Sequence, residues 1–134
     1  MSEDNKALTE QWFEQVWTVG RHDAIDELAH ENLVAHGLYL ENGEAVVTRD
    51  QFKEFHREFC GALSGISIDV EDLVAEGDKV AARCTARGIH SGDNPGDTPV
   101  EFTGISIVRF ENGQIIEAWN EFDFLRLFKQ IRRI

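Results

Sequence analysis

The residues best suited to proton chemistry lie close together near the C-terminus. Glu117, Trp119, Glu121 and Asp123 occupy every second position of one segment, and alternate residues of a strand share a face. If that face meets solvent, the acids only add solubility. If it is concave, Trp119 and Glu121 line a pocket, and burial there raises the pKa of a carboxyl group toward neutrality. Asp123, at the end of the segment, is either an acid–base residue or, as acids at strand ends commonly are, a cap or a solvated side chain.

A second candidate is Arg83, which lies in an earlier strand pattern. It shares one face of that strand with Thr85 and Arg87. An arginine in the middle of a strand either meets solvent or pairs with an acid inside the fold. In the second case its guanidinium could orient a carboxylate or hold a carbonyl oxygen.

Two histidines complete the candidate catalytic set. His36 ends a short apolar segment, and His90 stands at the mouth of a hairpin pattern. Each is either a proton carrier that also binds a substrate oxygen, or an edge residue with ordinary partners. His56 lies four residues before Cys60, but two ligands are too few for a metal site.

Several motifs are absent from the sequence. It contains no His-x-His, HExxH or Cys-x-x-Cys, and no GxGxxG, phosphate-binding loop or GxSxG. We therefore expect no metal, no cofactor and no serine nucleophile. Cys60 and Cys84 lie in apolar surroundings, where free buried thiols are the simplest interpretation.

Charge narrows the range of partners. The 134 residues carry 13 Lys and Arg against 25 Asp and Glu, a net charge of −12. Such a field repels nucleic acid and anionic membrane surfaces, and no segment is apolar enough to span a bilayer. We expect a cytoplasmic protein of one domain, residues 1–134. The dispersed acids favour solubility, and an adaptation to high salt is a further hypothesis.

The periodicity predicts the elements that position these residues. Apolar residues at helical spacing predict helices over 5–19, 22–30 and from Thr48, where Thr48 and Gln51 form a capping box. A short strand is predicted over 32–39. Period-two patterns predict strands over 66–75, 79–90, 100–110 and 114–123, with an Asn112–Gly113 hairpin turn, and a short helix follows over 124–131.

This order predicts an α+β fold. Long antiparallel strands curl, and a curved antiparallel sheet wrapped around the N-terminal helices encloses a pocket. The aromatic side chains that we expect to line this pocket, besides Trp119, are Trp17, Phe55, Phe59 and Phe102.

Several short motifs in the correct order resemble SnoaL-like polyketide cyclases. The resemblance rests on residues 80–90 (VAARCTARGIH), 100–105 (VEFTGI), Asn112–Gly113 and 117–123 (EAWNEFD), with further matches at 16–17, 26–28 and 34–36. It covers nearly the whole chain. It implies the cone-shaped fold of the nuclear transport factor 2-like superfamily.

The resemblance also implies a function. Members of known activity close a polyketide ring by intramolecular aldol condensation, without metal or cofactor. By similarity, Asp123 is the acid–base residue, and His90, His36 and Arg83 occupy family positions. The family usually associates through the exposed face of its sheet, so a homodimer that binds a small hydrophobic or polyketide-like ligand is implied.

One departure and two alternatives accompany this assignment. Residues 92–99 are shorter than the family's glycine-rich loop, so the substrate can differ. Limonene epoxide hydrolases share the cone, but their Arg-x-Asp strand pair is Arg83-x-Thr85 here. The other alternative is a non-catalytic module that binds a hydrophobic ligand or mediates dimerisation.

Overall fold

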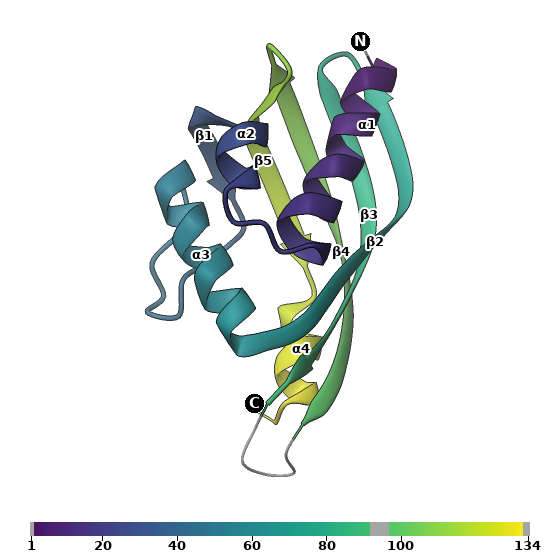
Figure 1. The fold of residues 1–134 in the computed structure, drawn as a ribbon. Coiled ribbons are helices and arrows are strands. Elements are labelled where there is room, and N and C mark those ends of the chain that lie inside the picture. The colour runs from purple at the N-terminus through teal and green to yellow at the C-terminus, as the bar shows by residue number, and fades with distance from the viewer. Residues whose placement is uncertain (1, 92–96, 133–134) are drawn as a thin grey trace.

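The computed structural model describes residues 2–91 and 97–132. Helices dominate the first half of the chain, and long strands dominate the second half (Figure 1). The helices are α1 (Ser2–Trp12), the π-helix η1 (Phe13–Thr18), α2 (Ala24–Leu28), α3 (Arg49–Ala62) and α4 (Phe124–Gln130). The strands are β1 (Ala29–His36), β2 (Leu63–Glu76), β3 (Lys79–His90), β4 (Thr98–Glu111) and β5 (Gln114–Phe122).

The five strands form one curved sheet in the order β1-β5-β4-β3-β2. β2 to β5 are antiparallel neighbours, as expected from the hairpin patterns. β1 instead pairs in parallel with β5, placing His36 beside Trp119. The sheet is therefore mixed, which corrects the expectation of a wholly antiparallel sheet. Alternation along β1 shows which residues share a face, but not the direction of the strand beside it.

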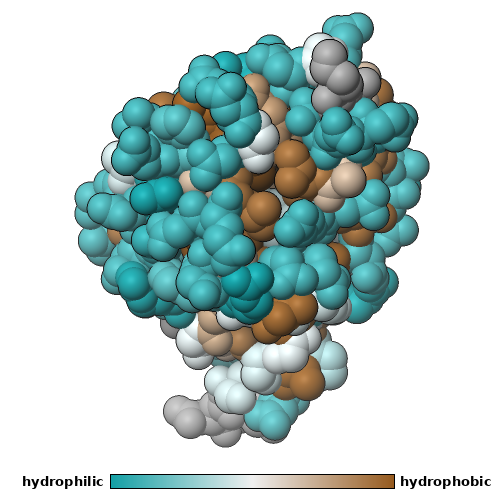
Figure 2. Space-filling view, turned by 45° about the horizontal axis from the view of Figure 1, so that its top comes forward, coloured by the Kyte–Doolittle hydropathy of each residue, from teal (hydrophilic) through white to brown (hydrophobic). Residues whose placement is uncertain are grey.

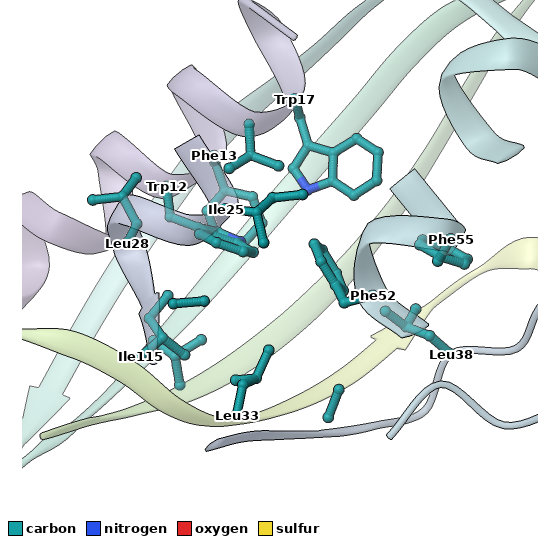
Figure 3. Close-up of a cluster of buried hydrophobic side chains, with 14 of the residues drawn as sticks. Trp12, Phe13, Trp17, Ile25, Leu28, Leu33, Leu38, Phe52, Phe55 and Ile115 are labelled. Carbon is teal, nitrogen blue, oxygen red and sulfur yellow. The ribbon is translucent and has the colours of Figure 1, made fainter. Parts of the chain in front are cut away.

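The helices α1, α2 and α3 lie against one face of the sheet, and α4 lies at one end (Figure 1). Between this helical layer and the sheet is the main core, where aromatic residues of α1, η1 and α3 meet aliphatic residues such as Leu33 and Ile115 (Figure 3). The predicted α+β cone is confirmed.

Local signals set the ends of several elements. Thr48 Oγ1 accepts a hydrogen bond from the Gln51 backbone N–H at 3.1 Å, and the Gln51 side chain accepts one from Thr48 N–H at 3.0 Å. This is the predicted capping box of α3. Asn112 and Gly113 have φ values of 52° and 77°, as a type I′ turn requires.

The first helix departs from the predicted pattern at its C-terminal end. The helix predicted over 5–19 is α-helical only to Trp12 and continues as η1, where Val19 N–H donates to Glu14 O at 2.7 Å. A π-helical hydrogen bond spans one more residue than an α-helical one. The π-helical pattern therefore changes which backbone carbonyls lack a partner within the helix. The spacing of apolar residues in the sequence does not reveal this difference.

Two further findings concern the chain as a whole. The shortened loop at 92–99 falls largely on residues outside the described ranges. Within residues 2–91 and 97–132, none of the helices has the length and apolar character needed to cross a bilayer.

Candidate functional site

The end of the fold near α4 contains a cavity of about 650 Å³, here called the mouth cavity. Its volume lies within the range typical of small-molecule sites, roughly 300–1,000 Å³. Most of its walls are apolar and come from α3, α4 and the start of β2. The residues that line it are Tyr39, Leu40, Glu41, Phe55, Glu58, Phe59, Ala62, Leu63, His90, Phe124, Leu127, Phe128 and Ile131.

Deeper in the cone lies a smaller void of about 50 Å³, the inner cavity. Its lining combines residues of α1, η1 and α3 with the concave face of the sheet. None of its described lining residues has a titratable side chain. It is too small for a drug-sized ligand as it stands.

Three phenylalanines line both cavities: Phe55, Phe59 and Phe124. The ring centroids of Phe55 and Phe59 lie 5.7 Å apart, and those of Phe59 and Phe124 lie 6.4 Å apart. These rings separate the mouth cavity from the inner cavity. An apolar ligand in the mouth cavity would therefore lie against these three rings.

The inner cavity has one polar pair on its wall, formed by Ser106 of β4 and Asn120 of β5. The Ser106 hydroxyl donates to Asn120 Oδ1 at 3.0 Å, and Asn120 Nδ2 donates to the His36 carbonyl at 3.1 Å. These two bonds fix the orientation of the amide, and its second N–H has no partner among the described residues.

Two glycines allow neighbouring groups to pack closely in this part of the sheet. A Cβ at Gly37, where φ is 88°, would lie 1.9 Å from the Asn120 carbonyl oxygen. A Cβ at Gly104 would lie 2.3 Å from the Phe122 ring. The first glycine lets β1 approach Asn120 closely, and the second leaves the space that Phe122 occupies on the inner cavity wall.

The structure brings several predicted site residues to these cavities. Trp17, Phe55, Phe59 and Phe102 line the inner cavity. His90 lines the mouth cavity, and its side chain has no hydrogen-bond partner among the described residues. Of the four proposed catalytic residues, it is the one that lines either of these two cavities.

Trp119, Glu121 and His36 lie elsewhere. Ala118, Asn120 and Phe122 line the inner cavity, so the alternate positions of β5 face outward. There the Trp119 ring stacks on His36 at 5.5 Å, and His36 Nε2 lies 2.8 Å from Glu117 Oε2. The hydrogen bond to Glu117 holds the pKa of that carboxyl below its ordinary value. The acids of β5 occupy the solvent face, which is the first of the two alternatives above.

Arg83 and Asp123 also lie outside the two cavities. Arg83 forms an exposed ion pair with Asp72 at 2.7 Å. The Asp123 carboxylate is exposed and accepts a hydrogen bond from Arg126 N–H at 3.0 Å, capping α4. With Glu121, both line an open depression on the outer face of the sheet. This placement makes Asp123 a helix cap and counts against general base chemistry in the cone.

A further polar cluster lies beneath the helices. His56 of α3 is 2% exposed, and its Nε2 lies 2.7 Å from the Val16 carbonyl in η1. Its Nδ1 lies 2.9 Å from His22 Nδ1. Burial lowers the pKa of both imidazoles. His22 is therefore partly buried and extends this cluster from His56 toward the surface.

Ser106, Asn120 and the His22–His56 pair are the polar groups that sequence reasoning missed. One signal was present, because Asn120 shares the apolar face of its strand with Ala118 and Phe122. No group of three or more potential metal ligands comes together within the described part of the chain.

The comparison with protein families agrees with this geometry. The family model of the SnoaL-like polyketide cyclases matches residues 7–131. The chain belongs to this family. A search of curated proteins found no match.

Solved structures show the same fold as this SnoaL-like chain. A provisionally assigned polyketide cyclase from Bacillus cereus is 26% identical, with a TM-score of 0.83 over 98% of this chain and 82% of that one. TsrD from Streptomyces laurentii is 23% identical, with a TM-score of 0.80 over 98% and 97%. A Catenulispora acidiphila protein with a ketosteroid isomerase-like fold is 15% identical, with a TM-score of 0.76 over 92% and 90%.

Proposed function

We propose that this protein binds a small apolar, polyketide-like molecule in the mouth cavity and catalyses acid–base chemistry on it without a cofactor. The observation that carries the proposal is a cavity of about 650 Å³ with aromatic walls. Its lining includes His90, whose side chain has no hydrogen-bond partner among the described residues. Membership of the SnoaL-like family supports a cyclase-type function on a small molecule.

The proposed reaction is of the enolate or aldol type. His90 removes a proton from a carbon next to a ligand carbonyl, and the resulting enolate carbon attacks a second carbonyl. His90 then returns the proton to the new alkoxide. The free N–H of Asn120 is suited to hold a carbonyl oxygen that reaches the inner cavity. Asp123, Arg83 and His36 are given no part in these steps.

A second candidate function is ligand binding without catalysis. The inner cavity has no titratable group among its described lining residues, and Asp123 serves as a cap. A carrier needs the apolar walls and the Asn120 amide but no proton-transfer group. The two functions therefore differ in whether His90 affects chemistry or only binding.

Proton exchange on a model ketone separates the two functions. We expect the protein to speed deuterium exchange next to the carbonyl of 2-tetralone at least tenfold over free imidazole at equal concentration, measured by NMR in D₂O. The His90→Gln variant should lose this acceleration while binding 2-tetralone as before. Binding without any acceleration in the wild type would favour the carrier.

We also propose a homodimer that forms through the outer face of the sheet. Ile105 and Ile107 on this face are 49% and 39% exposed, and ion pairs such as Arg83–Asp72 surround them. Exposed apolar residues inside a charged rim are typical of protein interfaces. The cytoplasm remains the compartment that we propose for this dimer.

A further inference from the structure

The charged side chains that line the mouth cavity are acidic. Two of the described lining residues are acids, Glu41 and Glu58, and none is a lysine or an arginine. The other titratable side chains there are those of Tyr39 and His90. Hydrophilic residues cover most of the face in Figure 2, and hydrophobic atoms surface toward its lower end, where Figure 1 places α4.

The bases on α3 do not neutralise these acids. Lys53 pairs with Asp26 at 2.6 Å, and Arg57 pairs with Glu54 at 3.3 Å. Within the described residues, neither Glu41 nor Glu58 has an ion-pair partner. Among the described residues that line the cavity, the two acids therefore have no lysine or arginine to balance them.

Glu58 is held in place at this rim. Its Oε1 accepts a hydrogen bond from the backbone N–H of Glu41 at 2.9 Å, which ties the loop after Leu40 to α3. A carboxylate can accept about four hydrogen bonds, so Glu58 keeps acceptor capacity for a ligand. Its position costs little ordering on binding, because the loop contact already restricts the side chain.

Aromatic rings add a second attraction for cations. Tyr39 and Phe128 line the same cavity and are 63% and 39% exposed. The negative face of an aromatic ring attracts an ammonium group. The net charge of −12 raises the local concentration of cations in addition.

We propose that the mouth cavity selects ligands in which an apolar ring system carries a protonated amine. The amine lies at the rim with Glu58 and Glu41, and the ring system lies against Phe55, Phe59 and Phe124. The cavity makes the site, and the two carboxylates determine the charge of the ligand that it prefers. This inference rests on the proposed function, because it assumes that the cavity holds the ligand.

Three naphthalene derivatives of similar size test the inference. They are 2-(1-naphthyl)ethylamine, 2-(1-naphthyl)ethanol and 1-naphthylacetate, which are cationic, neutral and anionic at pH 7.5. Dissociation constants are measured by isothermal titration calorimetry at low salt. We expect the amine to bind about 3- to 10-fold more tightly than the alcohol, and the acetate to bind most weakly, as is typical of partly exposed charge pairs.

Matched variants on one helix locate the effect. Glu58→Gln keeps an acceptor for the Glu41 N–H but removes the charge, and should reduce the preference for the amine to less than twofold. Glu54→Gln lies one turn earlier on α3, outside the cavity lining, and should keep the wild-type preference. Salt at 0.5 M should weaken amine binding and leave alcohol binding unchanged.

The outcomes separate this inference from the proposed function. If the alcohol binds but the amine has no advantage, or if Glu58→Gln keeps the advantage, the charge preference is wrong and the cavity still binds apolar ligands. If none of the three compounds binds at millimolar concentration, the mouth cavity is not the ligand site and both proposals fall.

Discussion

Asp123 shows how much the environment of a single residue decides its role. Its neighbours Phe122 and Phe124 both line the inner cavity. The Asp123 side chain points elsewhere and caps α4, whose Leu127 packs into the core. A carboxylate that accepts a helix N–H stabilises the helix and needs no catalytic role to explain its presence.

The capping role predicts how substitutions of Asp123 change the stability of the protein. Asp123→Ala should lower the free energy of unfolding by about 1 kcal/mol, because the Arg126 N–H loses its acceptor. Asp123→Asn should lower it far less, because the amide oxygen also caps. Urea unfolding measures both effects.

Glu121→Ala, which removes a nearby exposed acid, is the control and should leave stability close to that of the wild type. The Asn variant should also keep the full rate of 2-tetralone exchange. A loss of exchange in Asp123→Asn would return the aspartate to the catalytic set.

At the scale of elements, the π-helix η1 continues the first helix and contacts α3 through a hydrogen bond. Its Val16 carbonyl lies 2.7 Å from His56 Nε2, so His56 donates there and its Nδ1 is the acceptor for His22. His22 Nε2 is then a buried acceptor without a partner among the described residues. The neutral pair shares one hydrogen bond. A proton added at His56 Nδ1 would place two N–H donors face to face, and one added at His22 Nε2 would leave a buried donor without a partner among the described residues.

The pair predicts a pH dependence of stability. Burial lowers the pKa of His56 and of His22, and Arg57 and Lys53 lower that of His22 further, against the opposing charges of Asp26 and Asp23. The unfolded chain therefore binds more protons than the folded chain just below pH 6.5. The stabilisation is complete above pH 6.5 and is lost as the pH falls below it, by up to about 1.4 kcal/mol per pH unit for each proton.

Chemical unfolding between pH 7.5 and 5 measures this slope. His56→Gln, which keeps a donor for Val16, should flatten it. His30→Gln removes a histidine outside the pair and should keep the wild-type slope. An unchanged slope in His56→Gln would show that other groups cause the dependence.

At the scale of the whole molecule, the sheet has one face covered by helices and one face bare. Every arginine of β3 and β4 on the bare face pairs with an acid of a neighbouring strand: Arg83 with Asp72, Arg87 with Asp69 and Glu101, and Arg109 with Glu117. Between these pairs lies an apolar strip formed by Ile105 and Ile107. This strip is the part of the face that a partner would cover in the proposed dimer.

The proposed dimer predicts a mass of twice 15.2 kDa at micromolar concentration, measured by sedimentation velocity. Ile107→Lys places a charge within the strip and should shift the protein to monomer. Val19→Lys alters an exposed apolar residue between η1 and α2 and should leave the dimer intact. A wild type that sediments as a monomer would contradict the proposal.

The sequence by itself determined the fold class and most of the elements, although Ala29 and His30, predicted as the end of a helix, belong to β1. Local signals act over a few residues, so the Thr48–Gln51 capping box, the Asn112–Gly113 turn and the alternation along β3 and β4 were readable without coordinates. The aromatic stripe of α3 was readable for the same reason, and it supplied Phe55 and Phe59 of the cavity walls.

The tertiary structure alone decided which face of each strand met the helices. Alternation separates Asn120 from Trp119 but assigns neither to the inside, because the side covered depends on how α1 and α3 pack on the sheet. The same packing put Asp123 at a helix cap and His90 at the mouth. It also joined His22 to His56 across 34 positions of the chain, a contact that no local pattern encodes.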